Sequence, residues 1–232
     1  MYLLTETASP FALERWAAFF ANFGQFAKGF FYTLGISIGA LIVALLLGLI
    51  FGAMSSTHNK VLRGISRVYV EIFQNTPLLV QFVVVFYGIS ILTDGHGMIP
   101  ISLTAILCVG VYTGAYISEI IRTGIEAVPK GQTEAALSQG FTYADTMRII
   151  ILPQAVRTIL PPLTNQVVNL IKNTSTVAII SGADIMFTAK AWAYDTTNYV
   201  PAFAGAAFLY FIMCFPLATW ARRKEEENKK AY

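Results

Sequence analysis

Charged residues are scarce in this chain of 232 residues: they make up 12% of the sequence, whereas hydrophobic residues make up 56%. A soluble domain has about 25% charged and 45–50% apolar residues. The composition therefore excludes a disordered chain and argues against a soluble globule, which would expose apolar surface to water. Cysteine is also rare, and Cys108 and Cys214 both lie in apolar runs, which argues against a disulfide framework. The net charge of +3 is too small to indicate a nucleic-acid partner.

Long uncharged runs divide the sequence into segments of membrane size. A bilayer core of about 30 Å needs about 20 apolar helical residues. Four such runs predict membrane-spanning helices: residues 29–54, 72–93, 95–118 and 196–221. A fifth span is predicted over about residues 151–172, where Arg157 and Lys172 can extend their charges to the interface. The alternative for this fifth segment is a re-entrant or interfacial stretch, because Pro161-Pro162 lies within it.

The distribution of positive charge predicts the orientation of the chain. With five spans, one side of the membrane collects twelve Lys and Arg residues. The other side collects four: Arg15, Lys28, Lys172 and Lys190. Because positively charged residues concentrate on the cytoplasmic side, we expect an external N-terminus and a cytoplasmic C-terminus.

The chain is expected to divide into three parts. Residues 1–25 form an external or interfacial amphipathic segment whose helix starts at Ser9-Pro10, an N-cap followed by proline. Residues 26–222 form the transmembrane domain, with cytoplasmic coupling helices at about 131–148, and residues 223–232 form a cytoplasmic tail. Small residues four positions apart would let the helices pack closely. They occur at Gly35/Gly39, Gly48/Gly52, Gly110/Gly114 and Ala202/Ala206.

The cytoplasmic loop between the third and fourth spans has the pattern of two short helices. Thr133 can cap a helix whose first turn holds Glu134, and Gly140 suits the left-handed residue that ends it. Thr142 and Asp145 form a capping-box pattern that starts another helix. A short helix of this kind is suited to docking in a groove of another protein.

The residues of this loop and of the start of the next span resemble a known sequence motif. Glu134-Ala135-Ala136, Gly140 and Ile150-x-Leu152-Pro153 stand at the spacing of the EAA motif of binding-protein-dependent ABC importer permeases. Further segments resemble the polar amino acid permeases of the histidine, arginine and glutamine type: residues 71–81, 115–122, 128–131 and 171–176. The likeness covers about residues 26–220. Gln74 departs from the family, in which a basic residue is frequent at this position.

The resemblance implies an all-α integral membrane bundle of five transmembrane helices with the type I ABC importer (MetI-like) permease fold. It implies one permease subunit that moves a polar amino acid, including a basic one, into a bacterial cell across the inner membrane. Its partners would be a second permease subunit, identical or homologous, two ATP-binding cassette subunits and an external substrate-binding protein. The ATPase-coupling residues would be Glu134, Ala135, Ala136, Gly140, Leu152 and Pro153. The chain would need no cofactor of its own, because the partner ATPase would bind ATP and Mg.

Polar side chains at membrane depth are candidates for the substrate path, because burying them in the membrane costs free energy and is typical of residues with a function. The candidates are Glu71, Thr76, Gln81, Tyr112, Asn165, Asn169 and Asn173. The asparagines repeat every four residues and share a helical face, and Pro161-Pro162 is expected to break the helix before them. Thr76, Pro77 and Gln81 are expected to interrupt the second span in the same way. Equally, asparagines can hold helices together without lining a path. We expect Glu119 to pair with Arg122, whereas an unpaired Glu71 could contact a cationic cargo.

The sequence contains no G-x-x-x-x-G-K-[ST] loop, so the chain itself is not expected to be an enzyme that hydrolyses ATP. A membrane-embedded hydrolase is disfavoured because the two histidines, His58 and His96, fall in loops on opposite sides of the membrane. The alternative function is a stand-alone channel or secondary transporter for small solutes, which would not need the EAA motif. A structural membrane subunit is a further alternative.

Overall fold

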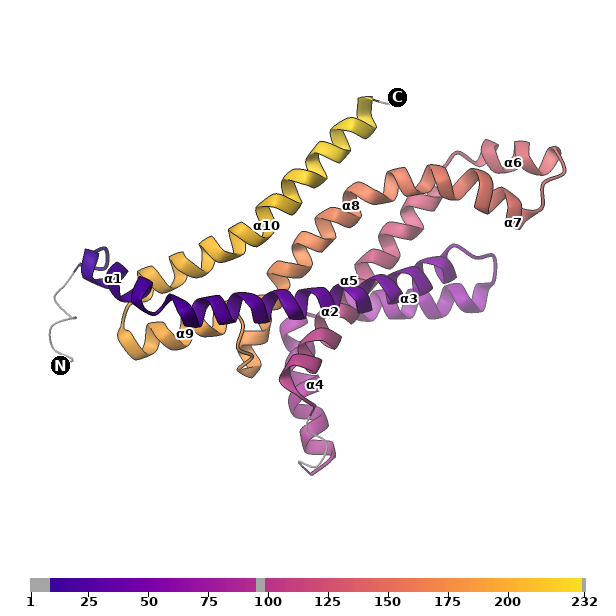
Figure 1. Ribbon diagram of the computed structural model, residues 1–232. Helices are drawn as coiled ribbons and strands as arrows, with labels where there is room; N and C mark the ends of the chain where they lie inside the picture. Colours follow the sequence, from indigo (N-terminus) through magenta and orange to yellow (C-terminus); the bar gives the residue numbers. More distant parts are fainter. Residues whose placement is uncertain (1–8, 95–98, 231–232) are drawn as a thin grey trace.

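The computed structural model describes residues 9–94 and 99–230, and in these ranges the regular secondary structure is helical throughout. In chain order the α-helices are α1 (Leu13–Ala21), α2 (Phe23–Ser55), α3 (Lys60–Gln74), α4 (Leu78–Leu92), α5 (Ile101–Glu126), α6 (Lys130–Ser138), α7 (Tyr143–Asp145), α8 (Leu152–Asn173), α9 (Ile185–Thr196) and α10 (Tyr199–Lys230). A π-helix, η1 (Thr146–Ile151), precedes α8, and a 3₁₀-helix, η2 (Thr174–Ile180), follows it. Helices α6 and α7 lie at one end of the molecule, and α1 and α9 lie at the other end (Figure 1).

Within the described residues, three helices are long and apolar enough to cross a membrane by themselves: α2, α5 and the first 25 residues of α10. They contain the predicted runs 29–54, most of 95–118 and most of 196–221. The third span begins at Ile101, and His96 lies outside the described residues.

The run 72–93 is interrupted at residues 75–77, which confirms the interruption predicted at Thr76, Pro77 and Gln81. Helices α3 and α4 meet at an angle of 97° across residues 75–77, and α4 points away from α2 and α3 in Figure 1. Pro77 causes the break, because it lacks a backbone N–H and disfavours helical geometry at Thr76. Gln81 stabilises the break: its Nε2 donates to Thr76 Oγ1 at 2.8 Å and to the Phe73 carbonyl at 3.2 Å. With 15 residues, or about 22 Å, α4 is too short to cross the bilayer core alone.

Helix α8 runs through Pro161 and Pro162 as one helix of 22 residues, so the predicted break at these prolines is wrong. Each proline removes one N–H donor from the helix, but the surrounding turns keep their helical geometry. The helix occupies the predicted segment 151–172 almost residue for residue. It is not among the three helices that are long and apolar enough to cross a membrane by themselves.

Helix α1 begins at Leu13 rather than at Pro10, and its N-cap residue is Ala12. The Ser9 hydroxyl instead accepts a hydrogen bond from Phe11 N at 3.3 Å, in the turn before the helix. At its far end α1 is docked rather than free. The side chain of Phe19 is buried and packs edge-on against Trp192 of α9.

The tightest helix pair is formed by α2 and α5, and it depends on glycine. A Cβ atom at Gly48 would lie 2.4 Å from Ile117 Cγ2, and one at Gly110 would lie 2.7 Å from Val43 Cβ. The backbones can therefore approach only because both positions lack a side chain. Gly35 does not take part, since a Cβ there would meet nothing within 4 Å. Close packing of α2 on α5 builds the frame against which α3 and α8 are placed.

Candidate functional site

Helix α6 and the turn after it form a hairpin in the segment where the sequence predicted two short helices. Gly140 has a φ of +84°, the left-handed geometry that the sequence predicted for it. The predicted capping pair also forms: Asp145 N donates to Thr142 Oγ1 at 3.2 Å, and the Thr142 hydroxyl donates to Asp145 Oδ2 at 2.6 Å. The predicted cap at Thr133 is wrong, because α6 already begins at Lys130, after Pro129. Thr133 and Glu134 therefore lie inside this helix.

The EAA residues of α6 are divided between a buried and an exposed side. Ala136 is buried, and its carbonyl accepts a hydrogen bond from Phe141 N at 3.2 Å. Glu134 and Ala135 are exposed, and so is Leu137 next to them. Leu152 and Pro153 are exposed at the start of α8. Small and apolar side chains at the tip of the molecule form a surface on which a partner protein can dock.

Sequence reasoning missed the π-helix η1, which joins this hairpin to α8. Its six residues pack against α6 on one side and continue into α8 without a break on the other. Thr146 and Ile151 are buried in this junction. Helix α6 is therefore in contact with the segment that begins α8. π-Helical turns are frequent at functional sites, but residue periodicity alone does not predict them.

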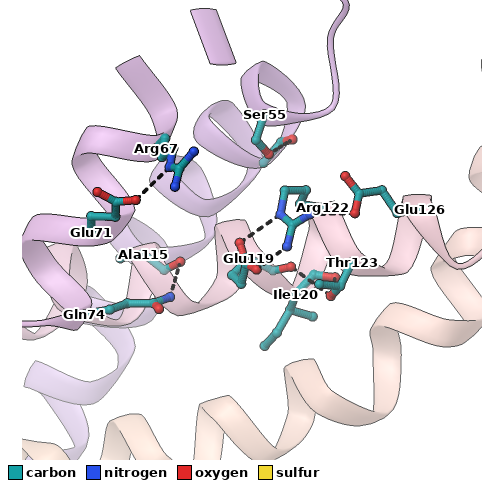
Figure 2. A network of polar contacts seen from close by, with 11 residues as sticks. Ser55, Arg67, Glu71, Gln74, Ala115, Glu119, Ile120, Arg122, Thr123 and Glu126 are labelled. Atoms are coloured by element: carbon teal, nitrogen blue, oxygen red, sulfur yellow. Dashed lines mark hydrogen bonds and ion pairs between the residues drawn. The ribbon is translucent and has the colours of Figure 1, made fainter. Parts of the chain in front are cut away.

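A polar cavity of about 800 Å³ lies between the end of α2, α3, the end of α5 and the start of α6. Five of its charged side chains form ion pairs with one another (Figure 2). Arg122 forms a bidentate ion pair with Glu119 and a second ion pair with Glu126 at 2.5 Å, so the predicted Glu119–Arg122 pairing is present. Glu71 is not the unpaired carboxylate considered above, because it forms an ion pair with Arg67 at 2.7 Å.

Hydrogen bonds from side chains to main-chain carbonyls tie α3 to α5 across this cavity. Gln74 Nε2 donates to the Ala115 carbonyl at 3.2 Å, as Figure 2 shows, and the Tyr69 hydroxyl donates to the Val111 carbonyl at 2.7 Å. Both side chains thus have a hydrogen-bond partner inside the bundle, where an unpaired polar group would cost free energy. Sequence reasoning gave Gln74 no role, since helix contacts cannot be deduced from its position alone.

The candidate path residues fall into separate groups. Thr76 and Gln81 bond to one another at the α3–α4 break, which is a structural role. Tyr112 shares a hydrogen bond of 3.1 Å with Tyr116, one turn further along α5. The three asparagines lie on α8. Asn165 and Asn169 are exposed, and Asn173 is half-buried.

A buried polar junction, also missed by sequence reasoning, joins α2, α9 and α10. Asp184 is fully buried, and it accepts hydrogen bonds from Met186 N at 3.1 Å, Phe187 N at 3.0 Å and the Tyr210 hydroxyl at 3.1 Å. Burial raises the pKa of Asp184, which lies outside the three candidate spans, to about 6. The carboxylate is used as the N-cap of α9 and as the anchor of α10.

Comparisons with known proteins agree with this arrangement. Residues 44–225 match the family described as "Binding-protein-dependent transport system inner membrane component". The chain is 37% identical over 216 residues to "Probable glutamine ABC transporter permease protein GlnM" of Bacillus subtilis, covering 92% of this chain and 97% of the relative. It is 34% identical to "Glutamate/aspartate import permease protein GltJ" of Escherichia coli K12, covering 82% and 85% of the two chains.

Solved structures have the same fold. The structure described as "Crystal structure of an amino acid ABC transporter with histidines" matches with a TM-score of 0.84 at 31% identity, covering 91% of this chain and 98% of that one. An inward-facing MetNI methionine ABC transporter matches with a TM-score of 0.69 at 16% identity, covering 88% and 98% of the two chains. At that identity, the second likeness concerns the fold alone.

Proposed function

The chain belongs to the family of binding-protein-dependent transport system inner membrane components and is a permease subunit of a polar amino acid ABC importer, and we propose that its helix α8 lines the path that the amino acid takes. Two permease subunits, identical or homologous, would enclose this path. The α8 helices would face each other across it. An external binding protein would deliver the amino acid, and two ATPase subunits would dock on the cytoplasmic side.

The polarity of α8 supports this placement. At membrane depth, polar side chains are costly against lipid and face the bundle interior or a water-filled cavity. Asn165 and Asn169 are exposed in the single chain and form no hydrogen bond with another described residue. They therefore need water, cargo or a second subunit opposite them. The glutamine and glutamate/aspartate relatives support a cargo of this polarity.

The proposed membrane arrangement has five crossings: α2, the bent pair α3–α4, α5, α8 and α10. The N-terminus is then external and the C-terminus cytoplasmic, in accordance with the excess of Lys and Arg on one side. In this orientation α6 and the polar cavity lie on the cytoplasmic side, and α1 and α9 lie on the external side. Figure 1 supports this division, because the two groups occupy opposite ends of the molecule.

The observation that carries the proposed coupling is that α6 packs against η1, which continues into α8 without a break. An ATPase docked on Glu134, Ala135 and Leu137 would displace α6 when it binds and hydrolyses ATP with Mg. The displacement would tilt α8 about its crossing with α5. At this crossing Gly124 lies so close to α8 that a Cβ atom would be 2.3 Å from Ile159 Cγ1. Tilting of α8 would open the path to one side or the other.

The coupling can be tested with two glycine substitutions in the same hairpin. Gly140→Ala imposes a left-handed φ on a residue with a Cβ, although nothing lies within 4 Å of the added atom. The backbone cost is about 1–2 kcal/mol. Gly131→Ala is the matched control, because it also lies in open space and its φ is not positive.

We expect Gly140→Ala to lower ATP-driven uptake of glutamine by the reconstituted complex several-fold while ATP hydrolysis continues, and Gly131→Ala to leave both unchanged. Equal uptake per ATP in the two variants would disprove the coupling role of this turn. Uptake by the chain alone without ATP would instead favour a stand-alone channel or secondary transporter.

A further inference from the structure

One face of α8 carries several exposed polar side chains and ends in a lysine. We call this set the α8 stripe: Thr158, Asn165, Asn169 and Lys172. The spacings of seven, four and three residues place all four on one helical face. All four are exposed. From Asn165 to Lys172 the stripe extends about 10 Å along the helix axis.

Lys172 is the only charged member of the α8 stripe, and among the described residues it has no ion-pair partner. Lys190 on α9 is similarly exposed but does not belong to the stripe. The polar members next to Lys172 are amides, which carry no charge and can both donate and accept hydrogen bonds. The stripe thus presents one positive charge and several neutral hydrogen-bonding groups.

Three carboxylates of the described helices are already engaged and are not available to a cationic cargo. Glu71 is paired with Arg67, and Glu119 is paired with Arg122. Asp184 is fully buried and accepts hydrogen bonds from two backbone N–H groups and one hydroxyl. A basic amino acid on the stripe would therefore meet a lysine, and none of these three carboxylates would be free to bind it.

From this distribution of charge we propose that Lys172 binds a carboxylate of the transported amino acid and that the α8 stripe accepts neutral amide and acidic amino acids but rejects basic ones. The inference rests on the proposed function, in which α8 lines the path. The ammonium of Lys172 attracts the α-carboxylate or an acidic side chain. The amides of Asn165 and Asn169 then lie within one to two turns and can bond the remainder of the molecule. A basic side chain is disfavoured by like-charge repulsion and by the loss of its hydration.

The test is equilibrium binding of radiolabelled glutamine, glutamate and arginine to the intact complex in nanodiscs, with the external binding protein omitted. Omitting that protein removes its own selectivity from the measurement. For the wild-type complex we expect glutamine and glutamate to bind and arginine to compete poorly. Lys172→Glu should weaken glutamate binding at least about fivefold and strengthen arginine binding. Lys172→Gln, which keeps a long polar side chain, should weaken glutamate binding without strengthening that of arginine as much.

Lys190→Glu is the matched control: it makes the same change of charge at an exposed lysine outside the stripe, and should leave the order of binding unchanged. Preferential binding of arginine by the wild-type complex would overturn the proposal. So would unchanged selectivity in both Lys172 variants, or an equal effect of Lys190→Glu. ATP-driven glutamine uptake by the full system distinguishes failure of the inference about Lys172 from failure of the proposed function. Uptake with unchanged selectivity at Lys172 sinks only this inference, whereas no ATP-driven uptake of any of the three amino acids sinks the proposed function and this inference with it.

Discussion

Replacing Gly48 by alanine should loosen the packing of α2 on α5. The added Cβ would lie 2.4 Å from Ile117 Cγ2 and 2.6 Å from Ile117 Cβ, both well inside van der Waals contact. A rotation about χ1 can move the Cγ2 atom, but it cannot move the Cβ atom. The backbones must therefore separate, which costs about 1–3 kcal/mol for overpacking of this kind.

The matched substitution is Gly35→Ala, in the same helix but with nothing within 4 Å of the new Cβ. Both variants gain the same helix propensity, up to about 1 kcal/mol, so the difference between them isolates the overpacking cost. For a domain of this size a cost of about 1–3 kcal/mol corresponds to a Tm difference of about 2–12 °C. Thermal unfolding of the purified protein in detergent, followed by tryptophan fluorescence, measures it. A Gly48→Ala variant that melts at or above the temperature of Gly35→Ala would refute the close approach of α2 and α5.

Two further predictions concern hydrogen-bonded side chains. Because the pKa of Asp184 is raised to about 6 by burial, the folded protein keeps a proton that the unfolded chain has lost between about pH 4 and pH 6. Stability should therefore fall as pH rises through this window, and Asp184→Asn should remove that part of the pH dependence of Tm; an identical pH profile in the variant would contradict the burial. Tyr69→Phe should lose the 2.7 Å hydrogen bond to the Val111 carbonyl and lower stability by about 0.5–1.5 kcal/mol. An unchanged or higher Tm would show that this bond does not hold α3 on α5.

Several features of the fold follow from local sequence and were predicted correctly. The apolar runs place α2, α5 and α10, because crossing a bilayer requires a long uninterrupted apolar helix whatever its neighbours are. Gly140 and the Thr142–Asp145 pair were also predicted, since a left-handed turn and a capping box involve only residues near in sequence. The Glu119–Arg122 pair belongs to the same class, being three residues apart on one helix.

One of two similar proline predictions failed. Interruptions were expected at Pro77 and at Pro161-Pro162, but only the first bends the chain, by 97°, whereas the second pair lies within a continuous helix. A proline removes one hydrogen bond in either case. Whether the chain bends depends on which groups nearby replace that bond, as Gln81 does beside Pro77.

The sequence by itself determined the all-helical membrane class, the family and the coupling motif, because these depend on composition and on spacings along the chain. Only the tertiary structure decided that Glu71 is paired, that Gln74 and Tyr69 bond to carbonyls of α5, and that Asp184 is buried between three helices. It also decided that the α8 stripe is exposed on one face and ends in a lysine without an ion-pair partner among the described residues. The physical reason is that the cost of a charge or hydrogen-bonding group depends on what surrounds it, and in a helical bundle those surroundings come from residues distant in sequence.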